Sequence, residues 1–207
     1  WGLHWWLESR EGQETPETIG VRRLYLYLAS LVTLALLALG VGRVAHVILT
    51  EGYASVFSVS VALPTEAGLW RPALRTSLAV AIVGGVGWVA HWLVFARRDY
   101  DSALRWVYLY VFAILGGIIT VMIAAGVIIE GTLTWAFGAL GRESTSDHFD
   151  FMPGAVASVA VGVAVWAYHW WRAQDEADTS PSLKLGANRS YEYLVACLGL
   201  GTVATGS

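Results

Sequence analysis

Long stretches without a charged side chain dominate this chain of 207 residues. A helix rises about 1.5 Å per residue, so roughly 20 apolar residues cross the hydrocarbon core of a bilayer. The stretches cover residues 24–42, 76–96, 106–129, 151–171 and 193–207. The first continues after Arg43 to Thr50, and the fifth has begun when the sequence stops. Because these runs lack the alternation of a membrane β-strand, they predict an all-α, polytopic transmembrane helical bundle.

The composition agrees with a membrane protein. Hydrophobic residues make up 56% of the chain and charged residues 14%, whereas soluble domains average about 45–50% and about 25%. These values exclude a disordered chain, a nucleic-acid binder and an ordinary soluble enzyme. The single cysteine, Cys197, excludes a disulfide framework or a cysteine zinc site. We therefore expect membrane lipid and other membrane subunits as partners, and no nucleic acid.

Basic residues gather in alternate connections. Nine of the 13 Lys and Arg residues lie on one predicted side of the membrane and four on the other. Loops rich in Lys and Arg stay in the cytoplasm. This asymmetry predicts that the links from Arg97 to Asp101 and from Arg172 to Lys184 are cytoplasmic.

Two motifs recur along the chain. The first begins with an arginine followed by paired tyrosines, whose first members, Tyr25, Tyr108 and Tyr191, are spaced 83 residues apart. The second, W-x-x-H-W, starts at Trp1, Trp88 and Trp166. The motifs alternate, so we interpret the unit as a helical hairpin that enters through the tyrosine motif and leaves through W-x-x-H-W.

The repeat divides the chain into segments. Residues 1–21 are expected to end a preceding hairpin, 22–98 and 104–172 to form two transmembrane hairpins, 173–188 to be a cytoplasmic link, and 189–207 to start a further repeat. Pro72 and Pro153 are expected to lie at the start of the return helices, after outer loops that follow Glu51 and Glu130. The parent protein should then extend beyond both ends of the sequence.

The motif residues are candidates for the functional surface. Positions i, i+3 and i+4 share one helix face, and aromatic side chains are common at membrane interfaces. Ten residues are predicted to be interface anchors: Tyr25, Tyr27, Trp88, His91, Trp92, Tyr108, Tyr110, Trp166, His169 and Trp170. Replacing either histidine by alanine should then cost little stability.

Axial ligation is the alternative for the histidines. Imidazole is a common haem ligand, and His91 and His169 from facing helices could hold a haem or a chlorin.

Arg43 is a further feature that belongs to neither motif. It lies about 27 Å along the helix from Tyr25 and therefore near the outer interface. His46 lies on the same face. The second hairpin has Gly126 at the position of Arg43, so a mechanism shared by the hairpins cannot depend on that arginine.

The run Arg22-Arg-Leu-Tyr-Leu-Tyr-Leu, followed by a Leu-, Ala- and Gly-rich block to Gly42, resembles an uncharacterised family of bacterial multi-pass membrane proteins, classed as a domain of unknown function. The resemblance implies a helical membrane fold and a location in the inner membrane. It implies no activity.

Together these features predict a non-enzymatic integral membrane protein that acts as a structural or accessory subunit of a larger assembly, with no cofactor, catalytic residue or metal site. Two alternatives stay open. One is a haem- or pigment-binding electron-transfer or light-harvesting subunit. The other is a transporter or channel, which repeated hairpins would suit.

Overall fold

The computed structural model describes residues 16–57, 72–99, 102–138, 144–177 and eight further residues between 189 and 201. These parts are helical and contain no strand. Four helical segments are long and apolar enough to cross a membrane: Thr18–Phe57, Pro72–Phe95, Ala103–Ala136 and Thr145–Glu176. The prediction of an all-α fold with transmembrane-length helices is therefore confirmed. The motif at Trp1, residues 1–15 of the predicted segment 1–21, residues 178–188 of the predicted link 173–188, and Tyr191 of the third tyrosine motif lie outside the described residues.

Two hairpins make up the described chain. In the first, α2 (Pro16–Phe57) is followed by α3 (Pro72–Trp88), a π-helix η1 (Val89–Phe95) and a short 3₁₀ turn η2 (Ala96–Arg98). In the second, α4 (Ala103–Trp106), a π-helix η3 (Val107–Ile114) and α5 (Leu115–Ala136) form one continuous rod. The short α6 (Thr145–His148) then leads into α7 (Met152–Ala177).

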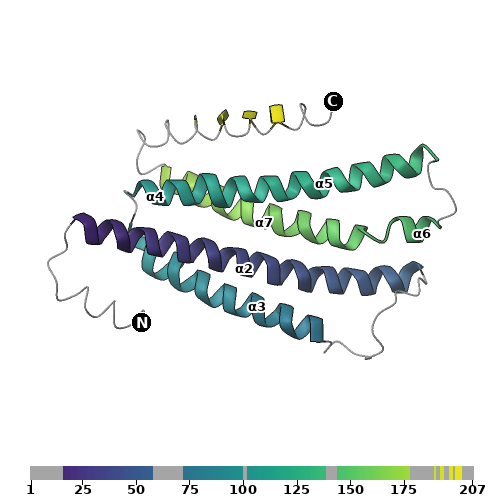
Figure 1. Ribbon diagram of the computed structural model, residues 1–207, viewed down its shortest axis with the longest axis horizontal. Coiled ribbons are helices and arrows are strands. Elements are labelled where there is room, and N and C mark those ends of the chain that lie inside the picture. Colours follow the sequence, from purple (N-terminus) through teal and green to yellow (C-terminus); the bar gives the residue numbers. More distant parts are fainter. Residues whose placement is uncertain are drawn as a thin grey trace.

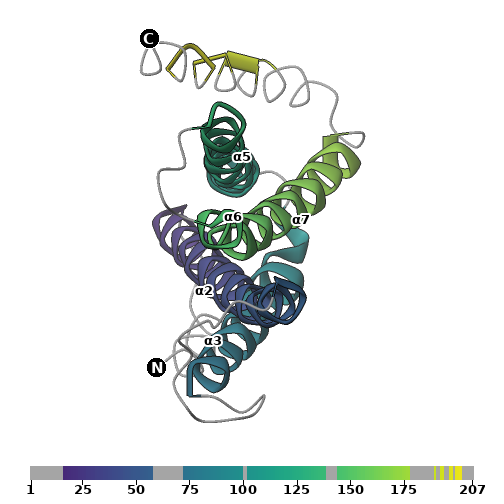
Figure 2. The same cartoon turned by 90° about the vertical axis from the view of Figure 1, so that its right-hand side faces the viewer.

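The long helices lie side by side (Figure 1). Helix α2 contacts α3 and α7, and α7 contacts α5. Viewed end-on, the order is therefore α3, α2, α7, α5 (Figure 2). We call the end at which α2 begins and α7 ends the proximal end, and the opposite end the distal end.

Glycines let the helices of each hairpin approach closely. A Cβ at Gly40 would collide with the Ala81 backbone, and one at Gly84 with the Leu37 backbone. In the second hairpin, a Cβ at Gly117 would lie 2.9 Å from the Gly162 carbonyl oxygen. Small residues at helix contacts are the usual means of close packing between membrane helices.

The buried core lies at the proximal end rather than along the whole bundle. It consists of Tyr27, Leu34, Trp92, Ala96, Tyr108, Leu109, Tyr110, Ala113, Ile114 and Ala173. Elsewhere large apolar side chains face outward, for example Val86 at 67% and Ile123 at 65% exposure. Such surfaces suit contact with lipid, because acyl chains are as apolar as these side chains.

The helix ends differ in part from the sequence prediction. Helix α3 begins at Pro72 and α7 one residue before Pro153, as predicted for the return helices. The outgoing helices run beyond the predicted ends, α2 to Phe57 and α5 to Ala136. Neither Glu51-Gly52 nor Glu130-Gly131 ends a helix, because an internal glycine weakens a helix by only about 1 kcal/mol. Likewise α7 continues five residues past Arg172 into the predicted link.

Candidate functional site

The motif residues meet charged partners at the proximal end in one buried cluster. We define the proximal cluster as Trp88, Trp92, Arg105, Tyr108, Tyr168, His169 and Glu176. Its members come from α3, η1, α4, η3 and α7. The cluster therefore joins both hairpins.

An ion pair forms the charged half of the proximal cluster. Arg105 donates from Nε to Glu176 Oε2 at 2.7 Å and from Nη2 to Oε1 at 2.6 Å. Its Nη1 donates to the Ala96 carbonyl at 2.6 Å, and its guanidinium lies 4.5 Å from the centre of the Trp92 ring. The side chains of Arg105 and Glu176 are only 1% and 4% exposed. A bidentate pair with a further acceptor and an aromatic face satisfies a buried guanidinium.

A hydrogen-bonded chain forms the neutral half. Trp88 Nε1 donates to the Tyr108 hydroxyl at 2.9 Å, and that hydroxyl lies 3.2 Å from His169 Nε2. His169 Nδ1 lies 2.8 Å from the Val165 carbonyl oxygen. A carbonyl can only accept, so Nδ1 carries the hydrogen and Nε2 of the neutral imidazole accepts from Tyr108. The chain thus runs from α3 through η3 to α7 with each polar atom paired.

Three further contacts tie the helices at this end. Trp92 Nε1 donates to the Tyr168 hydroxyl at 3.2 Å, joining η1 to α7. The Tyr27 hydroxyl donates to Asp99 Oδ2 at 2.9 Å, and Arg23 Nη2 pairs with Asp99 Oδ1 at 2.6 Å. Helix α2 is thereby fastened to the link between the hairpins.

The two described hairpins repeat one contact. The Tyr25 and His91 rings lie 5.9 Å apart at 69°, and the Tyr108 and His169 rings 5.7 Å apart at 68°. Each histidine also holds the carbonyl four residues earlier at 2.8 Å. The burial differs, since His169 is 1% and Tyr25 is 49% exposed. The 83-residue repeat as a whole stays a prediction.

The predicted anchor residues fall into three groups. Tyr27, Trp92, Tyr108, Tyr110 and His169 are buried among helices. Trp88, His91, Trp166 and Trp170 are half-buried, and Tyr25 is exposed. Among the buried residues, Tyr108 and His169 share a hydrogen bond between helices, and Trp92 bonds Tyr168 of α7. The expected low cost of replacing His169 assumed a surface imidazole and does not carry over to a buried one.

Sequence reasoning missed the charged partners of the cluster. Arg105 was not among the predicted site residues, and Glu176 was placed in the predicted link 173–188. Glu176 follows His169 by seven residues, which places both on one face of a helix. Continuing the helical period of the W-x-x-H-W segment past Arg172 would have revealed it.

The proximal cluster leaves little room for cofactor ligation by His169. Both ring nitrogens are engaged, so a metal bond would require the imidazole to lose its contact with Tyr108 or Val165. His91 uses Nδ1 for the Gly87 carbonyl. Within the described segments, no group of three or more His, Cys, Asp or Glu residues is placed to hold a metal ion.

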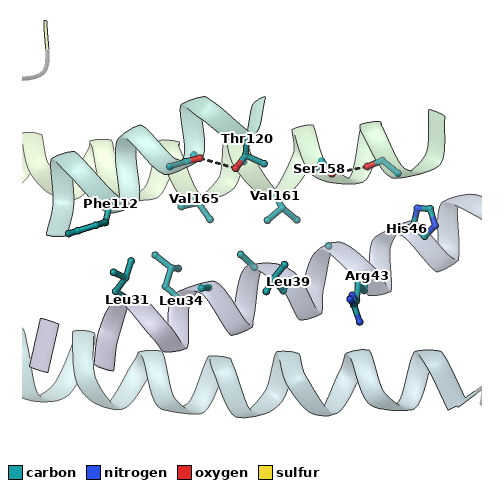
Figure 3. Close-up of a pocket in the computed structure, with 17 residues that line it drawn as sticks. Leu31, Leu34, Leu39, Arg43, His46, Phe112, Thr120, Ser158, Val161 and Val165 are labelled. Carbon is teal, nitrogen blue, oxygen red and sulfur yellow. Dashed lines mark hydrogen bonds between the residues drawn. The ribbon is translucent and has the colours of Figure 1, made fainter. Parts of the chain in front are cut away.

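A second candidate site is a groove of about 480 Å³ between α2, α5 and α7. Leu31 and Leu34 of α2 lie opposite Val165 of α7, and Val161 lies farther along α7, opposite Leu39 (Figure 3). The groove exists because α2 packs on α7 but not closely on α5. Helices α2 and α5 therefore stand apart, and α7 lies between them.

Comparison with known proteins identifies a family but no relative of known function. A family model described as a domain of unknown function, DUF5671, matches residues 23–152. The match covers the first hairpin and the outgoing helix of the second. No curated protein and no solved structure matches the chain.

Proposed function

Since the chain belongs to the DUF5671 family, a domain of unknown function, we propose its role from its own residues: a non-enzymatic, multi-pass membrane protein that serves as a structural or accessory subunit of a larger assembly. Two features support this role. Polar side chains of the proximal cluster join helices to one another. The first hairpin has an aromatic face that matches a face of the second hairpin, and the face of the second hairpin is buried.

The first feature is the pairing of polar groups inside the proximal cluster. A reactive centre needs a group free to meet a substrate. Here Arg105, Tyr108 and His169 each direct at least one polar atom to another helix of the same chain. Buried, satisfied polar networks rigidify a fold, so these residues suit a scaffold that holds two hairpins in a fixed relation.

The second feature carries the proposal that the scaffold belongs to an assembly. In the second hairpin, the Tyr108–His169 pair is covered by Trp88 and Trp92 of the first. The corresponding Tyr25–His91 pair has the same ring geometry, with Phe95 packed on His91 at 5.9 Å. Tyr25 and Phe95 are 49% and 50% exposed. An aromatic helix of another hairpin or subunit would cover this face as Trp88 and Trp92 cover its counterpart.

The membrane setting follows from the basic residues. We assign the protein to a bacterial inner membrane, with the proximal end in the cytoplasm, because the Arg-rich links lie at that end. About 33 Å of helix α7 separates Glu176, which pairs with Arg105 at the proximal end, from Gly154 at the distal end. That separation fits a hydrocarbon core of about 30 Å.

Photo-cross-linking in the native membrane tests the docking face. A benzophenone amino acid replaces Phe95 on the proposed face, and a second variant carries it at Ile123. Ile123 is a matched control, because it is equally apolar and 65% exposed but lies on α5, away from the face. We expect a discrete polypeptide adduct from position 95 and lipid adducts alone from position 123.

Two results would contradict the proposal. Lipid adducts alone at position 95 would mean that no protein covers this face. A Soret absorption band that disappears on replacing His91 or His169 would instead establish the haem-binding alternative, because axial ligation makes the band depend on the imidazole.

A further inference from the structure

The groove between α2, α5 and α7 has an apolar wall and one basic end. Small and aliphatic side chains line most of it, and no acidic residue is among its lining residues. Arg43 and His46 lie at its distal end. Its volume of about 480 Å³ lies within the range of about 300–1,000 Å³ typical of small-molecule sites.

The length of the groove matches one leaflet of a bilayer. Its lining on α2 runs from Leu31 to His46, which is about 22 Å of helix. One leaflet is about 15 Å of hydrocarbon and about 20–22 Å thick with its headgroup region. The apolar part therefore lies at the depth of acyl chains, and the basic end lies at the depth of phosphate headgroups.

The two basic side chains can reach a ligand at the mouth of the groove. Figure 3 shows His46 turned toward α7 and Arg43 turned away from it. Within the described part of the chain, no hydrogen bond or ion pair holds the Arg43 guanidinium, which is exposed. It can therefore turn about its own side-chain bonds toward the mouth. His46 packs on α7 where Gly154 has no side chain, since a Cβ there would lie 3.1 Å from His46 Nδ1.

We propose that this groove binds one anionic phospholipid, with an acyl chain between α2 and α5 and the phosphate at Arg43 and His46. Charge complementarity selects this occupant. A guanidinium forms strong, often bidentate hydrogen bonds with phosphate, whereas an apolar helix in the groove would leave that charge without a counter-ion. The site does not depend on the accessory role proposed above.

Lipid titration of the purified, delipidated full chain, followed by native mass spectrometry, tests the site. The probes are phosphatidylglycerol and phosphatidylcholine with identical acyl chains. We expect phosphatidylglycerol to bind about fivefold more tightly or better, because each basic residue near an anionic headgroup contributes a factor of that order. Arg43→Gln combined with His46→Gln should abolish this preference by weakening phosphatidylglycerol more than phosphatidylcholine, because both lipids carry the phosphate but only phosphatidylglycerol has a net negative charge. Arg75→Gln, which removes an exposed arginine of α3 outside the groove lining, should not change it.

Glycine variants test the acyl-chain part of the site. Gly116 lines the groove and Gly126 does not. A Cβ added at either position would meet no other group within 4 Å. Gly116→Leu should weaken both lipids about tenfold by displacing a few methylenes, while Gly126→Leu should bind both as the wild type does. Equal loss in the two variants would overturn the proposal.

A cross-linker within the groove identifies its occupant without altering the fold elsewhere. A benzophenone amino acid at the exposed lining residue Leu39 should form a phospholipid adduct in native membranes. A polypeptide adduct would overturn the proposal, because a protein helix would then fill the groove. Equal affinity of the wild type for the two probe lipids would overturn the headgroup assignment.

Discussion

Removing the charge of Glu176 should destabilise the protein strongly, because Arg105 would remain buried without its counter-ion. Glu176→Gln keeps the shape of the side chain and replaces one acceptor oxygen by an amide group. Arg105 would lose its bidentate partner at 1% side-chain exposure, and Arg172 would lose its 3.1 Å contact. Breaking a buried pair in this way costs about 3–5 kcal/mol. We expect a loss of that size in the free energy of unfolding.

Two further variants separate the charge effect from general damage. Asp175→Asn alters the neighbouring carboxylate, which is 57% exposed, and should change the free energy of unfolding by about 0.5 kcal/mol or less. Replacing both Arg105 and Glu176 by leucine removes the pair without leaving a charge. This double variant should be more stable than Glu176→Gln, because apolar replacement of a buried pair is often neutral.

The assay is reversible unfolding in lipid bicelles, followed by the fluorescence of the tryptophans around the cluster. Trp92 reports directly, since it lies under the Arg105 guanidinium. Stability of Glu176→Gln within about 0.5 kcal/mol of the wild type would refute the reasoning. A double variant as unstable as the single one would also refute it, because the penalty would then not come from an unpaired charge.

Three other outcomes are expected. Gly84→Leu should separate α2 from α3, because the Cβ meets the Leu37 backbone, and should raise the rate of proteolysis, whereas Gly126→Leu should not. Tyr108→Phe should lower the free energy of unfolding by about 1–3 kcal/mol, since it leaves the Trp88 indole and His169 Nε2 without partners; an unchanged unfolding midpoint would contradict this. A cysteine at Ser146 should react with an impermeant thiol reagent in intact cells and one at Asp175 should not; the reverse labelling would overturn the assigned sidedness.

The sequence was sufficient to predict the helices. A run of about 20 apolar residues has few alternatives in a bilayer, and proline at the first positions of a helix is a reliable start signal. Both Pro72 and Pro153 therefore marked the return helices correctly. The predicted helix ends at Glu51 and Glu130 were wrong, since α2 continues to Phe57 and α5 to Ala136 and an internal glycine weakens a helix by only about 1 kcal/mol.

The roles of the motif residues could not be predicted in the same way. A motif shows which side chains recur but not which face of the bundle they occupy. The π-helical turns at η1 and η3 also change the face that each residue occupies, and they bury the successive residues Tyr108, Leu109 and Tyr110. Because π-helical turns are rare, α-helical spacing did not predict that Tyr108 and Tyr110, two residues apart, are both buried.

The assembly proposal is tested most directly by the mass of the particle that contains this protein in its native membrane. Extraction of the full-length protein with a membrane-solubilising copolymer keeps its lipid and subunits together, and native mass spectrometry then gives the polypeptide composition. We expect each particle to hold the chain in a fixed ratio with at least one further membrane polypeptide or with another copy of the chain. The chain alone with lipid, in every particle, would contradict it.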